Sequence, residues 1–184
     1  INGDGKSYVS SNIALSLAIL GKKVALVGLD IRKPMLATYF NLNTKGHLTD
    51  YLAEPDIALD DVIIPSGEHK NLDLLPCGTI PPNPSELLQT DRLEELFAEL
   101  RKRYDYIIVD TAPVALVSDT YLLDRIADMT IFVSRYKYTP SEMIDYINQV
   151  IDQKRMHNVA CVLNGVKGNR MGYGYGYGYG TTEV

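Results

Sequence analysis

Five short apolar runs alternate along this chain with segments that suit helices. The runs cover residues 23–29, 71–76, 106–110, 129–134 and 158–164. The helical segments cover residues 7–20, 48–53, 85–104, 119–127 and 141–155. Apolar residues recur every three to four positions in the first of these, as an amphipathic helix requires. Strands that alternate with helices favour a doubly wound α/β domain, with a mostly parallel sheet and helices on both faces.

Three of these elements carry a more detailed expectation. The run at 106–110 is expected to be a buried strand that ends in a carboxylate, and Ser118 is expected to cap the helix at 119–127. The helix at 141–155 is expected to turn four apolar residues toward the core. They are Met143, Ile144, Ile147 and Ile151.

The composition is that of an ordinary soluble domain, with 46% hydrophobic and 22% charged residues in a chain of 184. That length suits one domain with a substantial core. The net charge of −5 argues against a protein that coats nucleic acid, so any basic site must be local. Cys77 and Cys161 lack the spacing of a zinc site or a disulfide framework, which indicates a reducing compartment. No apolar run reaches the roughly 18 residues that span a bilayer.

The sequence from Gly3 to Ser7 has the parts of a phosphate-binding loop that runs into a helix. Gly3 and Gly5 allow backbone N–H groups to close around phosphate oxygens. Lys6 is placed to reach the outer phosphates, and Ser7 offers a hydroxyl to Mg²⁺. The first glycine of the full pattern would lie before Ile1. The alternative interpretation is an ordinary glycine turn that caps a helix.

Two carboxylates that follow apolar runs are candidates for the same site. Asp110 ends the run at 106–110, and Asp30 follows the run at 23–29. The carboxyl ends of parallel strands meet at one edge of a sheet, where α/β folds bind ligands. Mg²⁺ bound to nucleotide phosphates needs such a carboxylate on a neighbouring strand. For each residue the alternative is a carboxylate that caps the next helix.

Five motifs, in order along the chain, resemble those of bacterial tyrosine kinases. They are VGLDIRKP at 27–34, the proline-rich segment at 75–88, DYIIVDTAP at 105–113, VSD at 117–119, and a cluster of four tyrosines near the C-terminus. The resemblance covers essentially the whole chain. It implies the fold of a P-loop NTPase, with a kinase domain at 1–167, whose first strand lies upstream of residue 1, and a flexible tail at 168–184.

The resemblance also implies cofactors and site residues. ATP and Mg²⁺ are the expected cofactors. The residues expected to bind the nucleotide are Gly3, Asp4, Gly5, Lys6, Ser7, Tyr8 and Asn164. Those expected to hold the metal are Ser7, Asp30 and Asp110. The expected catalytic residues are Lys6, Asp30, Asp110 and Arg32.

Three of these residues have a specific expected role or an alternative one. Asp30 is expected to accept or position the proton of a tyrosine hydroxyl, whose pKa is ordinarily about 10. Arg32 is expected to meet phosphate or the acceptor segment, and the alternative is a surface ion pair. Asn164 is expected to read the adenine edge, and the alternative is a turn-forming residue. Arg135, which follows a strand, is expected to be structural or interfacial.

Two positions depart from what related families have. Bacterial tyrosine kinases usually have an Asp where this chain has Gly28, so Asp30 or Asp110 must carry more of the metal-binding or base function. Cell-division and plasmid-partition ATPases, which share the fold, typically have a Lys where Ile1 stands and lack a tyrosine tail. A nucleotide-switched ATPase of that type is the second interpretation. A non-catalytic module that assembles with nucleotide is the third.

Gly and Tyr alternate from position 172 to position 180, a composition that cannot build a core. By resemblance, a neighbouring copy phosphorylates the tail tyrosines, which are Tyr173, Tyr175, Tyr177 and Tyr179. The alternative is a self-associating, low-complexity terminus with no catalytic role. Each phosphate would add about 1.5 to 2 negative charges, which should favour release of the tail from an acidic neighbour.

The resemblance further implies a location and partners. The protein is expected at the cytoplasmic side of the bacterial inner membrane, where it regulates exopolysaccharide or capsule synthesis and export. Expected partners are other copies of itself in a ring, a membrane polysaccharide copolymerase or activator, either fused or separate, and a cognate tyrosine phosphatase. Nucleic acid is not an expected partner.

Overall fold

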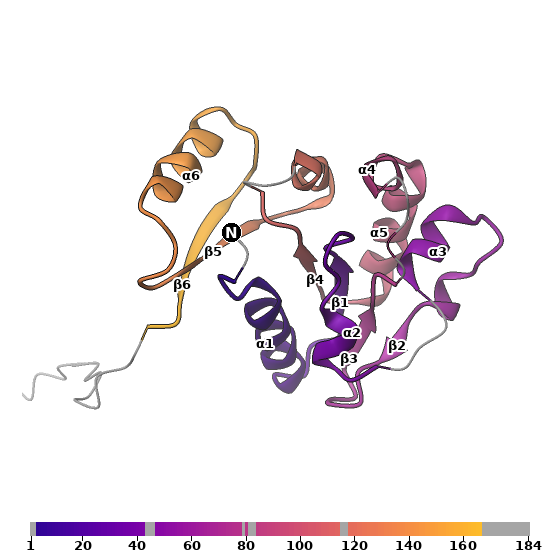
Figure 1. Ribbon diagram of the computed structural model, residues 1–184. Coiled ribbons are helices and arrows are strands. Elements are labelled where there is room, and N and C mark those ends of the chain that lie inside the picture. Colours follow the sequence, from indigo (N-terminus) through magenta and orange to yellow (C-terminus); the bar gives the residue numbers. More distant parts are fainter. Residues whose placement is uncertain (1–2, 43–46, 79, 81–83, 115–117, 167–184) are drawn as a thin grey trace, which may run out of the picture.

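The computed structural model describes residues 3–42, 47–78, 80, 84–114 and 118–166. Four strands form the main sheet, in the order β2-β3-β1-β4 (Figure 1). They are β1 (Val24–Leu29), β2 (Ile64–Pro65), β3 (Leu72–Leu75) and β4 (Tyr106–Thr111). β1 is parallel to both β3 and β4, and only the two-residue β2 is antiparallel. The predicted strand positions are confirmed, and β2 is an addition that the sequence did not suggest.

The last two strands form a separate parallel pair. They are β5 (Thr130–Arg135) and β6 (Val159–Asn164), with Thr130 opposite Val159. A cavity with an empty volume of about 560 Å³, part of it open to solvent, lies between the pair and the main sheet. It is lined by Thr111–Val114 on one side and Thr130–Ser134 on the other. In the described part of the chain, no strand pairs with the edge of β4 that is opposite β1.

This open edge explains why one prediction about β4 was wrong. The strand was expected to be buried, but among its residues only Asp110 is fully buried, and Tyr106 is 44% exposed. A central strand of a parallel sheet is covered on both faces and paired on both edges. β4 has a described partner on one edge only, so Ile107, Ile108 and Val109 stay partly accessible.

Helices cover both faces of the main sheet. α1 (Lys6–Ile19) packs on one face, where Ala14 and Ala18 meet Val24 and Leu26. α5 (Asp91–Arg103) packs on the other face. The remaining described helices are α2 (Leu36–Tyr39), α3 (Leu48–Ala53), η1 (Leu59–Asp61), α4 (Pro84–Leu87), η2 (Ser118–Ile126) and α6 (Glu142–Asp152).

The alternation of side chains along β1 explains its continuous apolar run. Val24 and Leu26 face α1, whereas Ala25, Val27 and Leu29 join the core that includes Leu93 and Leu96 of α5. All six residues of β1 are buried, because successive side chains point to opposite, covered faces.

Two predicted helices differ from expectation. The single helix expected at 85–104 is two helices, because Thr90 has an extended backbone (φ −74°, ψ 149°) that cannot continue the turn from α4. Its hydroxyl donates to the backbone oxygen of Leu87 at 2.8 Å. The helix expected after Ser118 is a 3₁₀ helix, and Ser118 is its first residue rather than its cap.

The inward face predicted for the helix at 141–155 is only partly correct. Ile147 is buried in α6, but Ile144 and Ile151 are 48% and 43% exposed. The other buried residue of α6 is Val150, which is 2% exposed and was not among the four predicted. The two-stranded β5–β6 pair offers a narrow surface, so it covers a narrower stripe of the helix than the sequence pattern suggests.

Candidate functional site

The backbone of the glycine-rich loop has the shape that a phosphate-binding loop requires. Gly3 and Gly5 have φ values of 87° and 90°, a region that glycine adopts at little cost. A Cβ on Gly5 would lie 2.2 Å from the side-chain nitrogen of Asn164, so the loop also approaches β6 too closely for a side chain. α1 begins at the next residue, with no acidic residue in its first turn. Free N–H groups and the helix dipole favour an anion here.

Asp110 lies at the carboxyl end of β4, beside the start of α1. It is 3% exposed, and burial raises the pKa of its carboxyl group above the usual value. A hydrogen bond with the Ser7 side chain and the charge of Lys6 oppose that rise, whereas the charge of Asp30 adds to it. These interactions show that the structure brings Lys6, Ser7, Asp30 and Asp110 together, as their places in the sequence predicted.

Asp30 follows β1 on the same edge of the sheet. One of its carboxylate oxygens accepts a hydrogen bond from the backbone N–H of Lys33 at 3.0 Å, which fixes the turn after the strand. The alternative interpretation, a cap of the next helix, is wrong, because α2 begins at Leu36 and Met35 stands at its cap position without a side-chain hydrogen bond. The charge of Asp30 acts on Asp110, so this carboxylate belongs to the loop site.

Gly28 lies directly opposite Asp110 in the sheet. A Cβ at this position would be 3.0 Å from Cδ1 of Leu36 and 3.4 Å from the backbone nitrogen of Cys77. Leu36 itself is only 2% exposed. An apolar side chain therefore occupies the space beside Gly28, the position where the resemblance described above implies an Asp.

The donor set at this edge fits Mg²⁺ bound together with a nucleotide. Among the residues described, no group of three or more His, Cys, Asp and Glu side chains forms a metal cage. Mg²⁺ usually takes one or two carboxylates and completes its shell with phosphate oxygens and water. The buried carboxylate of Asp110, the Ser7 hydroxyl and the nearby Asp30 provide that number of protein ligands.

Residues from β5, from the connection after it and from β6 hold the loop from the other side. The Arg135 guanidinium donates to the backbone oxygen of Gly3 at 3.1 Å, and the Thr139 hydroxyl donates to the Asp4 carboxylate at 2.7 Å. Asn164 donates through Nδ2 to the backbone oxygen of Asp4 at 2.9 Å. Asp4 is fully buried by these contacts. The predicted structural role of Arg135 agrees with this arrangement.

Sequence reasoning missed Thr139 as part of the site. The signal was its place in the connection after β5, which ends at the same edge of the fold as β4.

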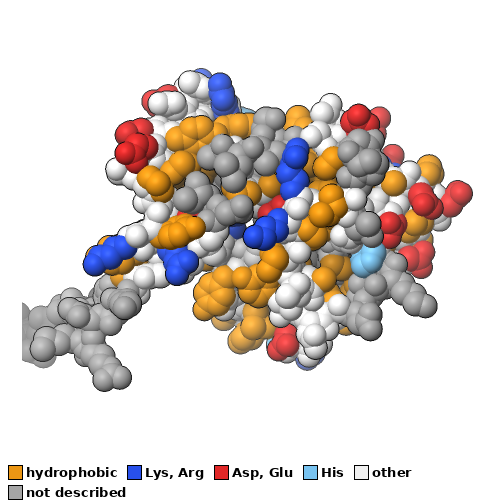
Figure 2. Space-filling model, viewed as in Figure 1, with side chains coloured by type: hydrophobic (Ala, Val, Ile, Leu, Met, Phe, Trp, Pro, Cys, Tyr) orange, Lys and Arg blue, Asp and Glu red, His pale blue; other side chains and the backbone are white. Residues whose placement is uncertain are grey.

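Basic side chains gather in the middle of the face that includes the start of α1 and the end of β4 (Figure 2), although the net charge of the chain is −5. The net charge had implied only that any basic site must be local.

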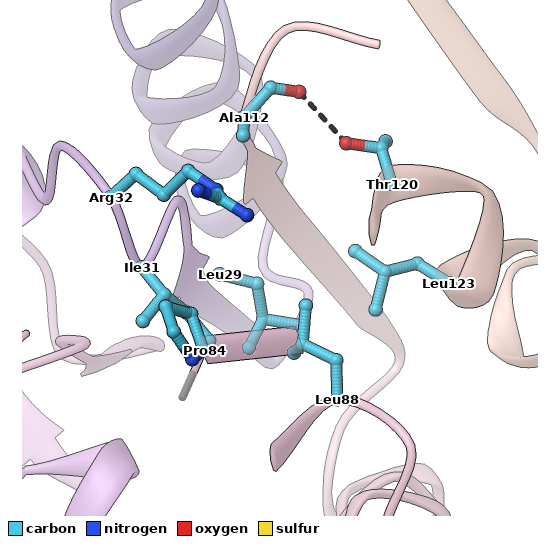
Figure 3. A pocket seen from close by; sticks show the side chains of 8 residues that line it. All are labelled: Leu29, Ile31, Arg32, Pro84, Leu88, Ala112, Thr120 and Leu123. Carbon is cyan, nitrogen blue, oxygen red and sulfur yellow. Dashed lines mark hydrogen bonds between the residues drawn. The ribbon is translucent and has the colours of Figure 1, made fainter. Parts of the chain in front are cut away.

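The other predicted residues lie further from the loop or outside the described part. Tyr8 is 55% exposed in the first turn of α1. Arg32 extends across an apolar hollow beside the ends of β1 and β4 (Figure 3). Ile1 and the four tail tyrosines lie outside the described residues. No described helix is long and apolar enough to cross a membrane.

Comparison with known proteins now places the chain in a family. The sequence model of the AAA domain matches residues 2–160. The tyrosine-protein kinase YwqD of Bacillus subtilis is 35% identical over 165 residues, which are 90% of this chain and 69% of YwqD. This chain belongs to the bacterial tyrosine kinase family. The tyrosine-protein kinase wzc of Salmonella typhimurium is 34% identical over 170 residues, or 92% of this chain.

Solved structures agree with the family and with the fold. The kinase domain of the Escherichia coli tyrosine kinase ETK superposes with a TM-score of 0.84 and 32% identity, over 96% of this chain and 69% of that one. The septum site-determining protein MinD of Pyrococcus horikoshii, solved with Mg-ADP, gives a TM-score of 0.71 at 23% identity over 89% of this chain and 66% of that one, which shows a shared fold alone. The predicted fold class is thus confirmed. The chain spans only 22 or 23% of the length of several relatives, among them wzc.

Proposed function

We propose that this protein is a protein-tyrosine kinase that transfers the γ-phosphate of ATP to tyrosines of its own C-terminal cluster in a neighbouring copy. The observation that carries the proposal is the meeting of three elements at one edge of the sheet. The start of α1 brings Lys6 and Ser7, β4 brings Asp110, and β1 brings Asp30. Membership of a family whose named members are tyrosine-protein kinases supports the same function.

Each residue has a role in the proposed reaction. Gly3 and Gly5 shape the loop whose N–H groups bind the ATP phosphates, and the Lys6 ammonium attracts the outer phosphates. Ser7 and Asp110 would hold Mg²⁺, which would offset the charge on the transferred group. Asp30 accepts the proton of the acceptor hydroxyl.

The acceptors in this proposal are Tyr173, Tyr175, Tyr177 and Tyr179. Glycines between them leave the backbone unhindered, so each phenol can approach an active site in an extended segment. Tail phosphates would repel one another and favour release from the neighbouring copy.

Gly28 favours a second candidate, a nucleotide-dependent assembly module without catalysis. Gly28, which lies opposite Asp110, carries no carboxylate, and Leu36 fills the space beside it. This site therefore has fewer carboxylates than the usual kinase pattern. The two candidates differ in a simple experiment. In pure protein with Mg-ATP, the kinase yields phosphotyrosine in the tail by mass spectrometry, and Lys6→Met abolishes it. An assembly module yields none, while its oligomeric state still responds to ATP.

The domain organisation is part of the proposal. We take residues 1–167 as the kinase domain and 168–184 as the acceptor tail. Among the described residues, the edge of β4 that faces the cavity between β4 and β5 is unpaired. This open edge supports a further parallel strand there, donated by residues upstream of residue 1. A chain extended at its N-terminus should then protect the β4 amides from hydrogen exchange.

The proposed setting follows the family. The kinase would act at the cytoplasmic side of the bacterial inner membrane, in a ring of copies, under a membrane activator of polysaccharide export and opposed by a cognate phosphatase. A co-purification with membrane fractions that depends on such an activator tests this setting.

A further inference from the structure

Tyr8 is an aromatic side chain on the solvent side of the first turn of α1, next to the phosphate-binding loop. It is 55% exposed, whereas α1 buries Ser10, Ala14 and Ala18 on the face that packs on the main sheet. Each residue of an α-helix is rotated by about 100° from the one before, so Tyr8 stands about 200° from Ser10, on the face that points away from the sheet. Its ring is thus placed beside the loop rather than in the core.

The side chains of Tyr8 and Asn164 border the loop at Gly5. A Cβ on Gly5 would be 4.0 Å from the Cβ of Tyr8 and 2.2 Å from Nδ2 of Asn164. The amide of Asn12 donates to the backbone oxygen of Tyr8 at 2.7 Å, which steadies the turn that carries the ring. A ligand whose phosphates bind the loop at Gly5 and Lys6 would therefore have Tyr8 as a neighbour.

The other sides of the loop are occupied. Toward β5 and β6, a Cβ on Gly3 would be 2.8 Å from the hydroxyl oxygen of Tyr138. On the same side, the fully buried Asp4 accepts a hydrogen bond from the Thr139 hydroxyl at 2.7 Å. Toward β4 lies the candidate metal site. The solvent side of the first turn of α1, where Tyr8 lies, remains as the direction in which the ribose and base of a bound nucleotide can extend.

We propose that the base of the bound nucleotide stacks on the ring of Tyr8. This inference rests on the proposed function, because it concerns the ATP that the kinase consumes, and it assigns to Tyr8 the recognition of the nucleoside. The loop holds phosphates by charge and by N–H groups, which pyrophosphate can also engage. An aromatic ring beside the loop adds a contact that only the nucleoside can make, since a base presents a flat π-face to it.

Such a stack recognises the face of a base and not its hydrogen-bonding edge. Every base has such a face, so stacking on Tyr8 supports adenine and guanine alike. The amide of Asn164, the other side chain beside Gly5, is engaged within the protein. Its Nδ2 donates to the backbone oxygen of Asp4 at 2.9 Å, and its Oδ1 accepts the N–H of Gly165 at 2.8 Å. Tyr8 thus provides affinity for the nucleoside without a preference between the two purines.

A comparison of ADP, GDP and pyrophosphate tests the inference by binding alone. None of these ligands has a γ-phosphate to donate, so the tail tyrosines stay unmodified during the measurement. Calorimetry in the presence of Mg²⁺ gives the dissociation constants for the unaltered chain, Tyr8→Ala and Tyr8→Phe. Tyr106→Ala is the matched control, because Tyr106 is 44% exposed at the amino end of β4, the opposite end of that strand from Asp110. Tyr138→Ala is a second comparison, because the Tyr138 ring packs on the loop at Gly3.

Tyr8→Ala should bind ADP and GDP about tenfold more weakly, as expected for the loss of one base–aromatic stack, with the affinity for pyrophosphate unchanged. Tyr8→Phe keeps the ring, so it should bind all three ligands as the unaltered chain does, and Tyr106→Ala should do the same. Tyr138→Ala should weaken all three ligands alike, because it alters the support of the loop itself.

Unchanged ADP affinity in Tyr8→Ala would overturn the inference. An equal loss for ADP and pyrophosphate would also overturn it, since the substitution would then act on the loop and not on a stack. Failure of all three ligands to bind the unaltered chain would contradict the proposed nucleotide site and the inference with it. Because the readout is binding, an absence of phosphotyrosine in the kinase assay would contradict the kinase function without altering these affinities.

Discussion

Asn164 donates a hydrogen bond through Nδ2 to the backbone oxygen of Asp4, at 2.9 Å. This contact joins the last strand of the fold to the phosphate-binding loop, across 160 residues of sequence. The Oδ1 atom of Asn164 accepts the N–H of Gly165 at 2.8 Å, which fixes the orientation of the amide. The loop thus has its shape set from β6 before any nucleotide binds.

Replacement of Asn164 by Ala should weaken nucleotide binding by about fivefold, because a hydrogen bond that shapes the loop is worth about 1 kcal/mol. If the residue only positions the loop, affinity for ATP and GTP should fall together. A selective loss of ATP affinity would show instead that Asn164 reads adenine. Asn71→Ala is the control, since Asn71 donates to the backbone oxygen of Ala18 near the other end of α1. Titration of the unaltered protein and both variants with fluorescent forms of ATP and GTP measures these affinities.

Asp110→Asn should stabilise the nucleotide-free protein while it reduces phosphate transfer by at least about 100-fold. Burial raises the pKa of this carboxyl group, so the folded state disfavours its charge. The unfolded chain then binds fewer protons than the folded one as pH rises above the ordinary value of 3.8, and stability falls. The gain in Tm from Asp110→Asn should therefore be larger at pH 7 than at pH 4. Thermal melts at both pH values check this, and an equal gain at both would contradict the assignment.

Gly28→Ala should lower the free energy of unfolding by about 1 to 3 kcal/mol, because its Cβ would crowd Leu36. Gly28→Asp should cost more, since it also buries a charge beside Asp110. Leu36→Ala makes room for the added atoms, so the double variant Gly28→Ala with Leu36→Ala should be more stable than the sum of the single effects predicts. Urea unfolding of the unaltered protein, the two single Ala variants and the double variant measures this coupling. Simple additivity would show that the Leu36 side chain does not clash with the added Cβ.

The two cysteines should differ sharply in reactivity. Burial, with smaller effects of Asp30 and Asp50, raises the pKa of the Cys77 thiol to about 12, whereas Cys161 is exposed. At pH 8, iodoacetamide should alkylate Cys161 while Cys77 reacts at least about 100-fold more slowly. Because the unfolded thiol ionises first, the free energy of unfolding should also fall as pH rises from the ordinary value of 9.0 toward 12. Peptide mapping after timed alkylation gives both rates, and equal labelling would show that Cys77 is accessible.

The order of strands and helices was predictable because local patterns specify it. The run at 23–29 became β1, and the amphipathic segment after Ser7 became α1, within one or two residues. Other features depend on distant contacts. The division into two sheets reflects which strand edges meet, and the exposure of Ile144 reflects the narrow surface beneath α6.

The same distinction applies to the candidate site. Lys6, Ser7, Asp30 and Asp110 were predictable because each stands at a strand end or a helix start, and such ends meet in a parallel sheet. Thr139 was not, because its hydrogen bond to Asp4 links residues 135 positions apart. The hollow beside Arg32 was equally hidden, since its walls come from segments on both sides of α5 in the chain.

The central claim is that phosphate leaves ATP for tyrosine rather than for water, and a phosphate balance tests it most directly. The protein is incubated with Mg-ATP labelled at the γ-phosphate, and label in phosphotyrosine and in free phosphate is counted over time. The kinase account predicts that most early label enters the tail, and that Phe at all four tail tyrosines removes this fraction and slows ATP consumption. Release of free phosphate at an unchanged rate in the Phe variant, with no label in the intact tail, would contradict it.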